Sequence, residues 1–174
     1  MDIINYFIQN PGKEYHVREL AKLTKKSPTT VSKYLKQLEK EKILFSIKKF
    51  NHLFFKANQT SSFYKDKKLF YNVNLLRESG LVEYLKDKYD SEAIVLFGSF
   101  AKAENIAKSD IDILVVSLVK KEVNLKKFEK KIGHEVQVFL HSRKELESME
   151  KSNKGLMNNF LNGFVLDGFW EVFR

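Results

Sequence analysis

The N-terminal part of the chain repeats apolar side chains at the spacing of one side of a helix. Residues 2–10 carry this pattern until Pro11-Gly12 ends it, and residues 16–24 carry it again. Residues 28–42 predict a third helix, with apolar residues on one side and hydroxyl and lysine side chains on the other. A short turn separates the second and third helices, which is the geometry of a helix-turn-helix.

The residues around the third helix predict its start and the element that follows it. Ser27 is a preferred N-cap, and Pro28 suits the first helical position. Beyond the helix, residues 43–49 and 52–58 are rich in β-forming side chains and flank Phe50-Asn51. We therefore expect a β-hairpin with basic residues near its tip.

The second half of the chain predicts strands as well as helices. Residues 59–92 have a helical pattern that Gly80 interrupts, and they contain no Pro-, Gly- or Ser-rich stretch that would make a flexible linker. Residues 93–97 and 109–117 are apolar runs that predict buried strands. After a further helix, residues 134–140 predict another strand.

Helices and a terminal strand are expected after residue 140. Ser142 and Glu145 form a capping-box pattern that starts a helix, and a further helical piece ends at Gly163. Residues 164–173 predict a strand or a hairpin in which Trp170 is buried.

Composition limits the classes of function. The chain has 174 residues, of which 43% are apolar, and no cysteine. The lack of cysteine excludes disulfides, thiolate zinc sites and cysteine nucleophiles, and it fits a reducing compartment. No apolar run is long enough to cross a membrane, and the N-terminus lacks the features of a secretion signal. We expect a cytoplasmic protein without membrane contact.

The net charge of +9 comes entirely from the N-terminal part of the chain. Residues 1–68 hold 15 Lys and Arg against 6 Asp and Glu, whereas residues 69–174 hold 16 of each kind. Such a basic block is typical of a module that binds a polyanion. The alternative is a lysine-rich solvated surface of the kind found in heat-adapted proteins, and the charge alone does not distinguish the two.

The stretch HVRELAKLTKKSPTTVSKYLKQLEKEKILFSIKK resembles the winged helix-turn-helix of prokaryotic, archaeal-type transcription regulators. The resemblance covers residues 1–58 and implies DNA as the partner, with a module that binds only proteins as the alternative. The implied DNA contacts are hydroxyl and lysine side chains on the third helix and the hairpin: Ser27, Thr29, Thr30, Lys33, Lys36, Lys40, Lys48 and Lys49.

Asp110 and Asp112 stand one residue apart in an otherwise apolar run. Side chains alternate along a strand, so both carboxylates share one face while Ile111 points into the core. Carboxylates about 7 Å apart repel each other unless a cation lies between them. Mg²⁺ fits such a place, because it accepts one or two carboxylates and completes its shell with water and phosphate oxygens. An edge strand with two exposed aspartates is the alternative.

The turn before this run is suited to phosphate. Gly98-Ser99 follow a strand directly, so backbone can approach a ligand closely, and a helix start follows. The pattern Gly98-Ser99, ten residues, Asp110-x-Asp112 resembles the signature of the polymerase-β nucleotidyltransferase superfamily, in particular its minimal nucleotidyltransferase domains. The resemblance implies that Gly98, Ser99 and Lys102 bind a nucleoside triphosphate. It also implies that Asp110 and Asp112 bind Mg²⁺.

The same resemblance implies a third carboxylate on a later strand, which helps to bind metal or activates the acceptor hydroxyl. Counted from Gly133, that position holds Gln137, which is neutral and a weak ligand for Mg²⁺. Glu135 lies two residues earlier on the same face and is the candidate substitute. Phe100 and Ala103 also depart from the pattern, which usually has arginine and glycine there.

Together these patterns predict an α+β protein of two domains. Residues 1–58 are expected to form a winged helix-turn-helix DNA-binding domain, and residues 59–92 a helical connector. Residues 93–174 are expected to form a nucleotidyltransferase-type α/β domain with a small mixed sheet.

Three functions are open at this point. The first is a DNA-binding protein that binds Mg²⁺ and an NTP, with ATP favoured, and transfers a nucleotide, with AMP favoured, to an acceptor. Asp110, Asp112 and Glu135 would then be catalytic. The second is a transcription regulator with an inactive domain that serves as nucleotide sensor or dimerisation unit. The third is an antitoxin whose partner is a small helical toxin, and a homodimer is compatible with each.

Overall fold

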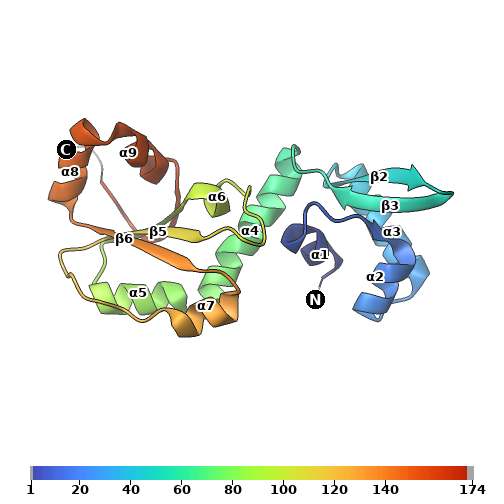
Figure 1. The fold of residues 1–174 in the computed structure, drawn as a ribbon, viewed down its shortest axis with the longest axis horizontal. Coiled ribbons are helices and arrows are strands. Elements are labelled where there is room, and N and C mark those ends of the chain that lie inside the picture. Colours follow the sequence, from blue (N-terminus) through green and yellow to red (C-terminus); the bar gives the residue numbers. More distant parts are fainter. Residues whose placement is uncertain (1, 172–174) are drawn as a thin grey trace. The chain divides into compact units, whose positions relative to one another are not determined.

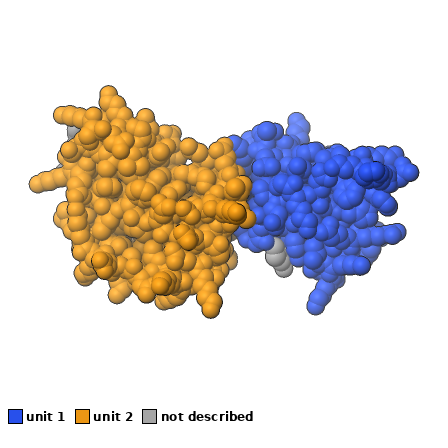
Figure 2. Space-filling model, viewed as in Figure 1, with its two compact units in different colours: residues 1–71 blue, residues 72–174 orange. Residues whose placement is uncertain are grey.

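The computed structural model describes residues 2–171. The chain divides into two compact units, residues 1–71 and residues 72–174, which Figure 2 colours separately. The boundary lies inside helix α4 (Ser62–Ser79), so α4 contributes residues to both units. The segment expected as a connector contains α4 and α5 (Leu81–Tyr89).

Unit 1 combines helices with a three-stranded antiparallel sheet of order β1-β3-β2 (Figure 1). Its elements are α1 (Ile3–Gln9), β1 (Tyr15–His16), α2 (Val17–Thr24), α3 (Pro28–Lys40), β2 (Leu44–Lys49), β3 (His52–Ala57) and the start of α4. The three predicted helices and the hairpin are confirmed, whereas the two residues of β1 are too few to leave a pattern in the sequence. The β2–β3 hairpin, residues 44–57, is termed the wing.

Helices α2 and α3 form the helix-turn-helix of unit 1. The backbone leaves α2 at Lys25, which has a left-handed φ of 54°. Ser27 then caps α3 by accepting a hydrogen bond from the backbone N–H of Thr30. Apolar side chains of α1, α2, α3 and the sheet meet in one core, where Leu20 and Leu35 are fully buried. The opposite side of α3 exposes Lys33, Lys36 and Lys40 to solvent.

Unit 2 is built on a four-stranded mixed sheet of order β6-β5-β4-β7 (Figure 1). Strand β4 pairs antiparallel with β5 and β7, whereas β5 and β6 run parallel. After α5 the elements are β4 (Ala93–Phe97), α6 (Gly98–Ala101), β5 (Ile111–Val116), α7 (Lys126–Ile132), β6 (Val136–His141), α8 (Arg143–Ser152), α9 (Lys154–Leu161) and β7 (Phe164–Gly168). The predicted small mixed sheet is confirmed.

Helices cover both faces of this sheet, with α8 and α9 on one side and α5 and α7 on the other (Figure 1). On the α8–α9 side, Met157 and Phe160 belong to the same buried cluster as Val95 and Leu114 of the sheet. Strand β4 is buried along its whole length, and β5 is buried except at Asp112. Asp112 is therefore the one polar interruption in β5.

Helix α4 buries a different side from the one that its phenylalanines suggest. Phe63 and Phe70 are 56% and 67% exposed, whereas Tyr64 and Asn72 are each 1% exposed. Apolar residues are spread around this helix, so their spacing alone does not decide which side packs.

The C-terminal strand is confirmed as β7, and Trp170 is half-buried against the α8–α9 cluster. Residues 169–171 of the expected strand or hairpin are not in a strand, and residues 172–173 lie outside the described residues. Within residues 2–171 no helix combines the length and the apolar character needed to cross a bilayer.

Candidate functional site

Asp110 and Asp112 lie at the start of β5, at one end of the sheet of unit 2. Asp112 is paired with Phe97, the last residue of β4, on one side and with Gln137 of β6 on the other. Asp110 comes directly before β5, two residues from Asp112, and alternation along the chain places both on one face. The intervening Ile111 is fully buried. The carboxylates thus share a face while the isoleucine packs in the core.

Gly98 brings the turn after β4 against the carboxylate of Asp112. Its φ of 68° lies in the left-handed region, and a Cβ built on it would be 2.3 Å from Asp112 Oδ2. Glycine alone fits both this backbone and this distance. The predicted turn is therefore adjacent to Asp112, and Ser99 follows Gly98 in helix α6.

Replacing Gly98 with alanine is expected to destabilise the protein by more than about 1–2 kcal/mol, the cost of a left-handed backbone, because the methyl also displaces Asp112. Thermal unfolding followed by circular dichroism measures the effect. Gly155→Ala is the matched control, since only Asn153 Oδ1, at 3.9 Å, lies within 4 Å of the added Cβ and α9 favours alanine. An unchanged unfolding temperature for Gly98→Ala would contradict the close approach.

The surroundings of Asp112 oppose its ionisation. Burial raises the pKa of Asp112 above its usual range, and the charge of Asp110 raises it further. A divalent cation bound to both would favour their charged forms. Two carboxylates are a donor set that Mg²⁺ accepts when phosphate oxygens and water complete its shell. The residues present therefore fit Mg²⁺.

Gln137 occupies the position at which a third carboxylate was expected. It lies opposite Asp112 in the parallel β5–β6 pair, and its Nε2 donates a hydrogen bond of 2.8 Å to Asp110 Oδ2. Across the part of the chain that the structure describes, no group of three or more Asp, Glu, His or Cys side chains is placed to hold a metal. The site consists of two carboxylates and one amide.

Glu135 is not gathered into this site. It precedes β6, its side chain is exposed, and its carbonyl oxygen accepts a hydrogen bond from the N–H of Ile111 at 2.9 Å. This residue contributes its backbone to the β5–β6 ladder. The structure thus brings Gly98, Asp110 and Asp112 together and leaves the carboxylate of Glu135 outside.

The loop between α6 and β5 is held by a residue that the sequence did not indicate. The Nδ2 atom of Asn72 in α4 donates to Phe100 O and to Asn105 Oδ1, both at 2.9 Å. No sequence pattern marks Asn72, because the apolar residues of α4 do not decide which side of the helix packs. Ala103 has a left-handed φ of 55°, a conformation that glycine adopts without strain, and the resembled superfamily usually has glycine at this position. Lys102 is exposed at the end of α6.

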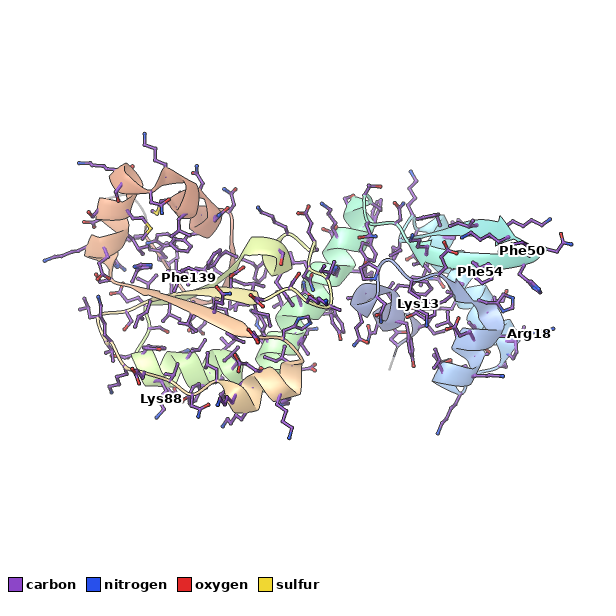
Figure 3. All side chains as sticks on the ribbon, in the orientation of Figure 1. Lys13, Arg18, Phe50, Phe54, Lys88 and Phe139 are labelled. Atoms are coloured by element: carbon purple, nitrogen blue, oxygen red, sulfur yellow. The ribbon has the colours of Figure 1, made fainter. Side chains whose placement is uncertain are left out.

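In unit 1 the exposed side of α3 lines a groove of about 650 Å³, termed the α2–α3 groove. The residues that line it are His16, Val17, Arg18, Pro28, Thr29, Ser32, Lys33 and Lys36. Thr29, Lys33 and Lys36 are among the predicted DNA contacts, whereas Arg18, labelled in Figure 3, lines the groove but was not predicted as a contact. Arg18 stands alone at the start of α2, and no sequence pattern there indicates that it lines a groove.

Three other predicted DNA contacts lie outside this groove. The hydroxyl oxygens of Ser27 and Thr30 are 2.8 Å apart and take part in the N-cap of α3. Lys40 stands at the last position of α3 and lines a separate cavity of about 500 Å³. The groove therefore gathers three of the predicted contacts of α3: Thr29, Lys33 and Lys36.

The wing carries the remaining two predicted contacts. The Nζ atom of Lys49 lies 2.8 Å from a carboxylate oxygen of Glu14, so its charge is partly compensated within unit 1. Lys48 is exposed and pairs with Leu53 of β3. Basic residues of unit 1 thus reach solvent from both α3 and the wing.

Two known families match separate parts of the chain. Residues 78–161 match the family of nucleotidyltransferase domains, and residues 1–44 match the arsR family of bacterial regulatory proteins. The N-terminal part is therefore similar to an arsR-type helix-turn-helix, and the C-terminal part is similar to a nucleotidyltransferase domain. Both classes agree with the fold of the corresponding unit, and the helix-turn-helix supports binding to DNA.

A relative from Methanocaldococcus jannaschii carries the name "Putative protein adenylyltransferase MJ1379". It is 58% identical to this chain over 31 residues, which are 18% of this chain and 31% of the relative. The match thus spans about a third of the relative's length. The comparison with solved structures gives no match.

Proposed function

We propose that this protein is a DNA-binding regulator whose nucleotidyltransferase domain binds a nucleoside triphosphate, with ATP favoured, together with Mg²⁺. The arsR-type helix-turn-helix supports the DNA contact, and the α2–α3 groove offers exposed lysines for it. The nucleotidyltransferase match and the paired carboxylates support the nucleotide contact. The nucleotide would be the signal to which the regulator responds.

Each residue of the site has a role in this proposal. Asp110 and Asp112 would hold Mg²⁺, while Gly98 and Ser99 would contact the triphosphate and Lys102 would add positive charge. The metal would neutralise phosphate charge and help to orient the triphosphate. Because the pKa of Asp112 is raised, protons compete with the metal at acid pH.

The observation that carries the proposal is the hydrogen bond from Gln137 Nε2 to Asp110 Oδ2. This hydrogen bond shows a neutral amide at the position where a third carboxylate was expected. An amide cannot take a proton from an acceptor hydroxyl. The two carboxylates that remain are those expected to bind the metal. This arrangement favours binding of the nucleotide over its transfer, and hence a sensing role.

Adenylyl transfer is the second candidate, and the name of the relative favours it. In that reaction an acceptor hydroxyl oxygen attacks the α-phosphorus of ATP and forms a new P–O bond. The bond to the bridging oxygen breaks, and pyrophosphate leaves with the electron pair. The hydroxyl proton must pass to a base, and Glu135 would have to turn from its exposed position to accept it.

Two measurements on the full chain separate these functions. Calorimetric titration with ATP, with and without Mg²⁺, measures binding, and incubation with α-labelled ATP measures transfer to the protein or to an added acceptor. We expect Mg²⁺-dependent binding and no transfer. Transfer that Asp110→Asn abolishes would establish the second candidate, and a lack of Mg²⁺-dependent binding would overturn both.

Gln137→Glu is expected to make the response to Mg²⁺ larger. A third carboxylate beside Asp110 adds repulsion, so the unfolding temperature without metal should fall by a few degrees, at about 2–4 °C per kcal/mol for a chain of this size. Mg²⁺ relieves that repulsion, so the rise on adding metal should exceed that of the wild type. The measurement is a thermal unfolding series in increasing Mg²⁺.

Gln137→Ala is the control, because it removes the same hydrogen bond without adding charge. Its unfolding temperature should fall, but its rise on adding Mg²⁺ should equal that of the wild type. If the glutamate and alanine variants respond alike to Mg²⁺, Gln137 does not border the metal site.

A further inference from the structure

The tip of the wing exposes a large aromatic side chain on an unusual backbone. Phe50 is 95% exposed and stands at the end of the hairpin, as Figure 3 shows. Its φ is 47°, and that of the next residue, Asn51, is 61°. These two residues connect Lys49 of β2 to His52 of β3. The hairpin thus turns through two consecutive left-handed residues.

A two-residue turn of this kind favours glycine, asparagine or aspartate at both positions. Asn51 satisfies that preference, whereas a phenylalanine in the left-handed region is strained. At 95% exposure its ring makes almost no packing contacts that could offset the strain. The fold of unit 1 therefore does not account for a phenylalanine here, and such strain is typical of functional positions.

The surroundings of Phe50 suit a polyanion with an apolar interior. Lys48 and His52 are exposed on the two strands next to the tip. The wing belongs to the same unit as the arsR-type helix-turn-helix and its α2–α3 groove. Duplex DNA combines outer phosphates, which attract cations, with base steps that admit an apolar ring.

We infer that Phe50 is a wedge that enters the minor groove of DNA and inserts between base pairs while Lys48 contacts the adjacent phosphates. Apolar side chains are known to enter base steps in this groove and to kink the duplex. This inference rests on the proposed DNA binding and adds a contact with the bases to it. The left-handed turn presents the ring beyond the ends of both strands.

The exposed phenylalanines of α4 provide a contrast. Phe63 and Phe70 are also exposed, but they lie on regular helix and carry no comparable backbone strain. They have neither a left-handed backbone nor a place at a hairpin tip. Phe63 is therefore a suitable control for the loss of an exposed aromatic ring from unit 1.

The test compares Phe50→Gly, Phe50→Leu and Phe63→Ala with the wild type. Affinity is measured by fluorescence anisotropy on a mixed-sequence duplex of about 30 base pairs at several salt concentrations. A second duplex series carries 2-aminopurine, whose fluorescence rises when a base step is unstacked. Circular dichroism verifies folding, and Phe50→Gly should be at least as stable as the wild type, because glycine suits the left-handed turn.

We expect Phe50→Gly to bind about ten- to a hundredfold more weakly, which is the range for losing one base–aromatic contact, and to lose the 2-aminopurine signal. Its salt dependence should equal that of the wild type, because no phosphate contact is removed. Phe50→Leu should retain most of the affinity, since leucine also acts as a wedge. Phe63→Ala should bind as the wild type does.

Wild-type affinity and signal in Phe50→Gly would overturn the wedge while leaving DNA binding intact. A flatter salt dependence in that variant would also overturn it, because the tip would then act through phosphates. If sedimentation shows a wild-type dimer that Phe50→Gly dissociates, the tip is a contact between two copies instead. If the wild type binds no duplex DNA, the proposed function fails together with the wedge.

Discussion

Asp112→Asn is expected to abolish the stabilisation of this protein by Mg²⁺ and ATP while leaving the unliganded protein at least as stable as the wild type. The wild type should gain about 2.7 kcal/mol in free energy of unfolding when the ligand is at a hundred times its Kd. That gain corresponds to a rise of several degrees in unfolding temperature. The variant should show no such rise.

The direction of both effects follows from the environment of the carboxyl group. Burial and the charge of Asp110 raise the pKa of Asp112, so the folded protein binds a proton there more readily than the unfolded chain does. Ionisation of Asp112 therefore lowers the free energy of unfolding as the pH rises through its folded pKa. Asparagine removes that cost near neutral pH and also removes the negative charge that would bind the metal.

The measurement is thermal unfolding at neutral pH with buffer, Mg²⁺ alone, ATP alone and both together. Asp87→Asn is the matched control, because Asp87 is exposed on α5 of the same unit and the substitution changes the charge equally. The control should respond as the wild type does. An Asp112→Asn variant that keeps the ligand-induced rise would show that the metal is bound elsewhere.

The parts of the site that are close in sequence could be predicted. Two neighbouring strands and the turn after the first of them largely fix the positions of the residues that they contain. The alternation around Ile111 placed Asp110 and Asp112 on one face, and the glycine after β4 indicated a close approach of backbone. Counting from Gly133 also gave the residue opposite Asp112, since β6 runs parallel and in register with β5.

The contacts made by side chains from distant segments could not be predicted. No pattern shows that Gln137 turns its amide toward Asp110 and not toward solvent. The role of Asn72 depends on which side of α4 packs, and the apolar residues of that helix do not decide it. Exposure of Phe50 follows from the hairpin, but its left-handed φ is visible only in the structure.

The double variant Lys33→Glu, Lys36→Glu is expected to bind DNA roughly fiftyfold more weakly at 0.1 M salt. Both lysines are exposed on α3 and line the α2–α3 groove. Each phosphate contact releases counterions, so the loss of two contacts should lower the slope of log K against log salt by about 2. Added glutamates near phosphates also repel the duplex.

Fluorescence anisotropy on a mixed-sequence duplex across a salt series measures both the affinity and the slope. Lys144→Glu, Lys151→Glu is the matched control, because it makes the same change of net charge on exposed positions of α8 in unit 2. If net charge alone governed binding, the two double variants would lose the same affinity. We expect the control to retain nearly all of it.

The comparison of the two slopes tests the assignment of the groove directly. The loss of a phosphate contact must lower the salt dependence of binding, because fewer counterions are then released from the DNA. A change in folding, or in the net charge of the protein, would weaken binding without lowering the number of released counterions by a fixed amount. An unchanged slope in the α3 variant would therefore mean that DNA does not occupy the α2–α3 groove. The helix-turn-helix would then have to bind through other residues, even if the overall affinity had fallen.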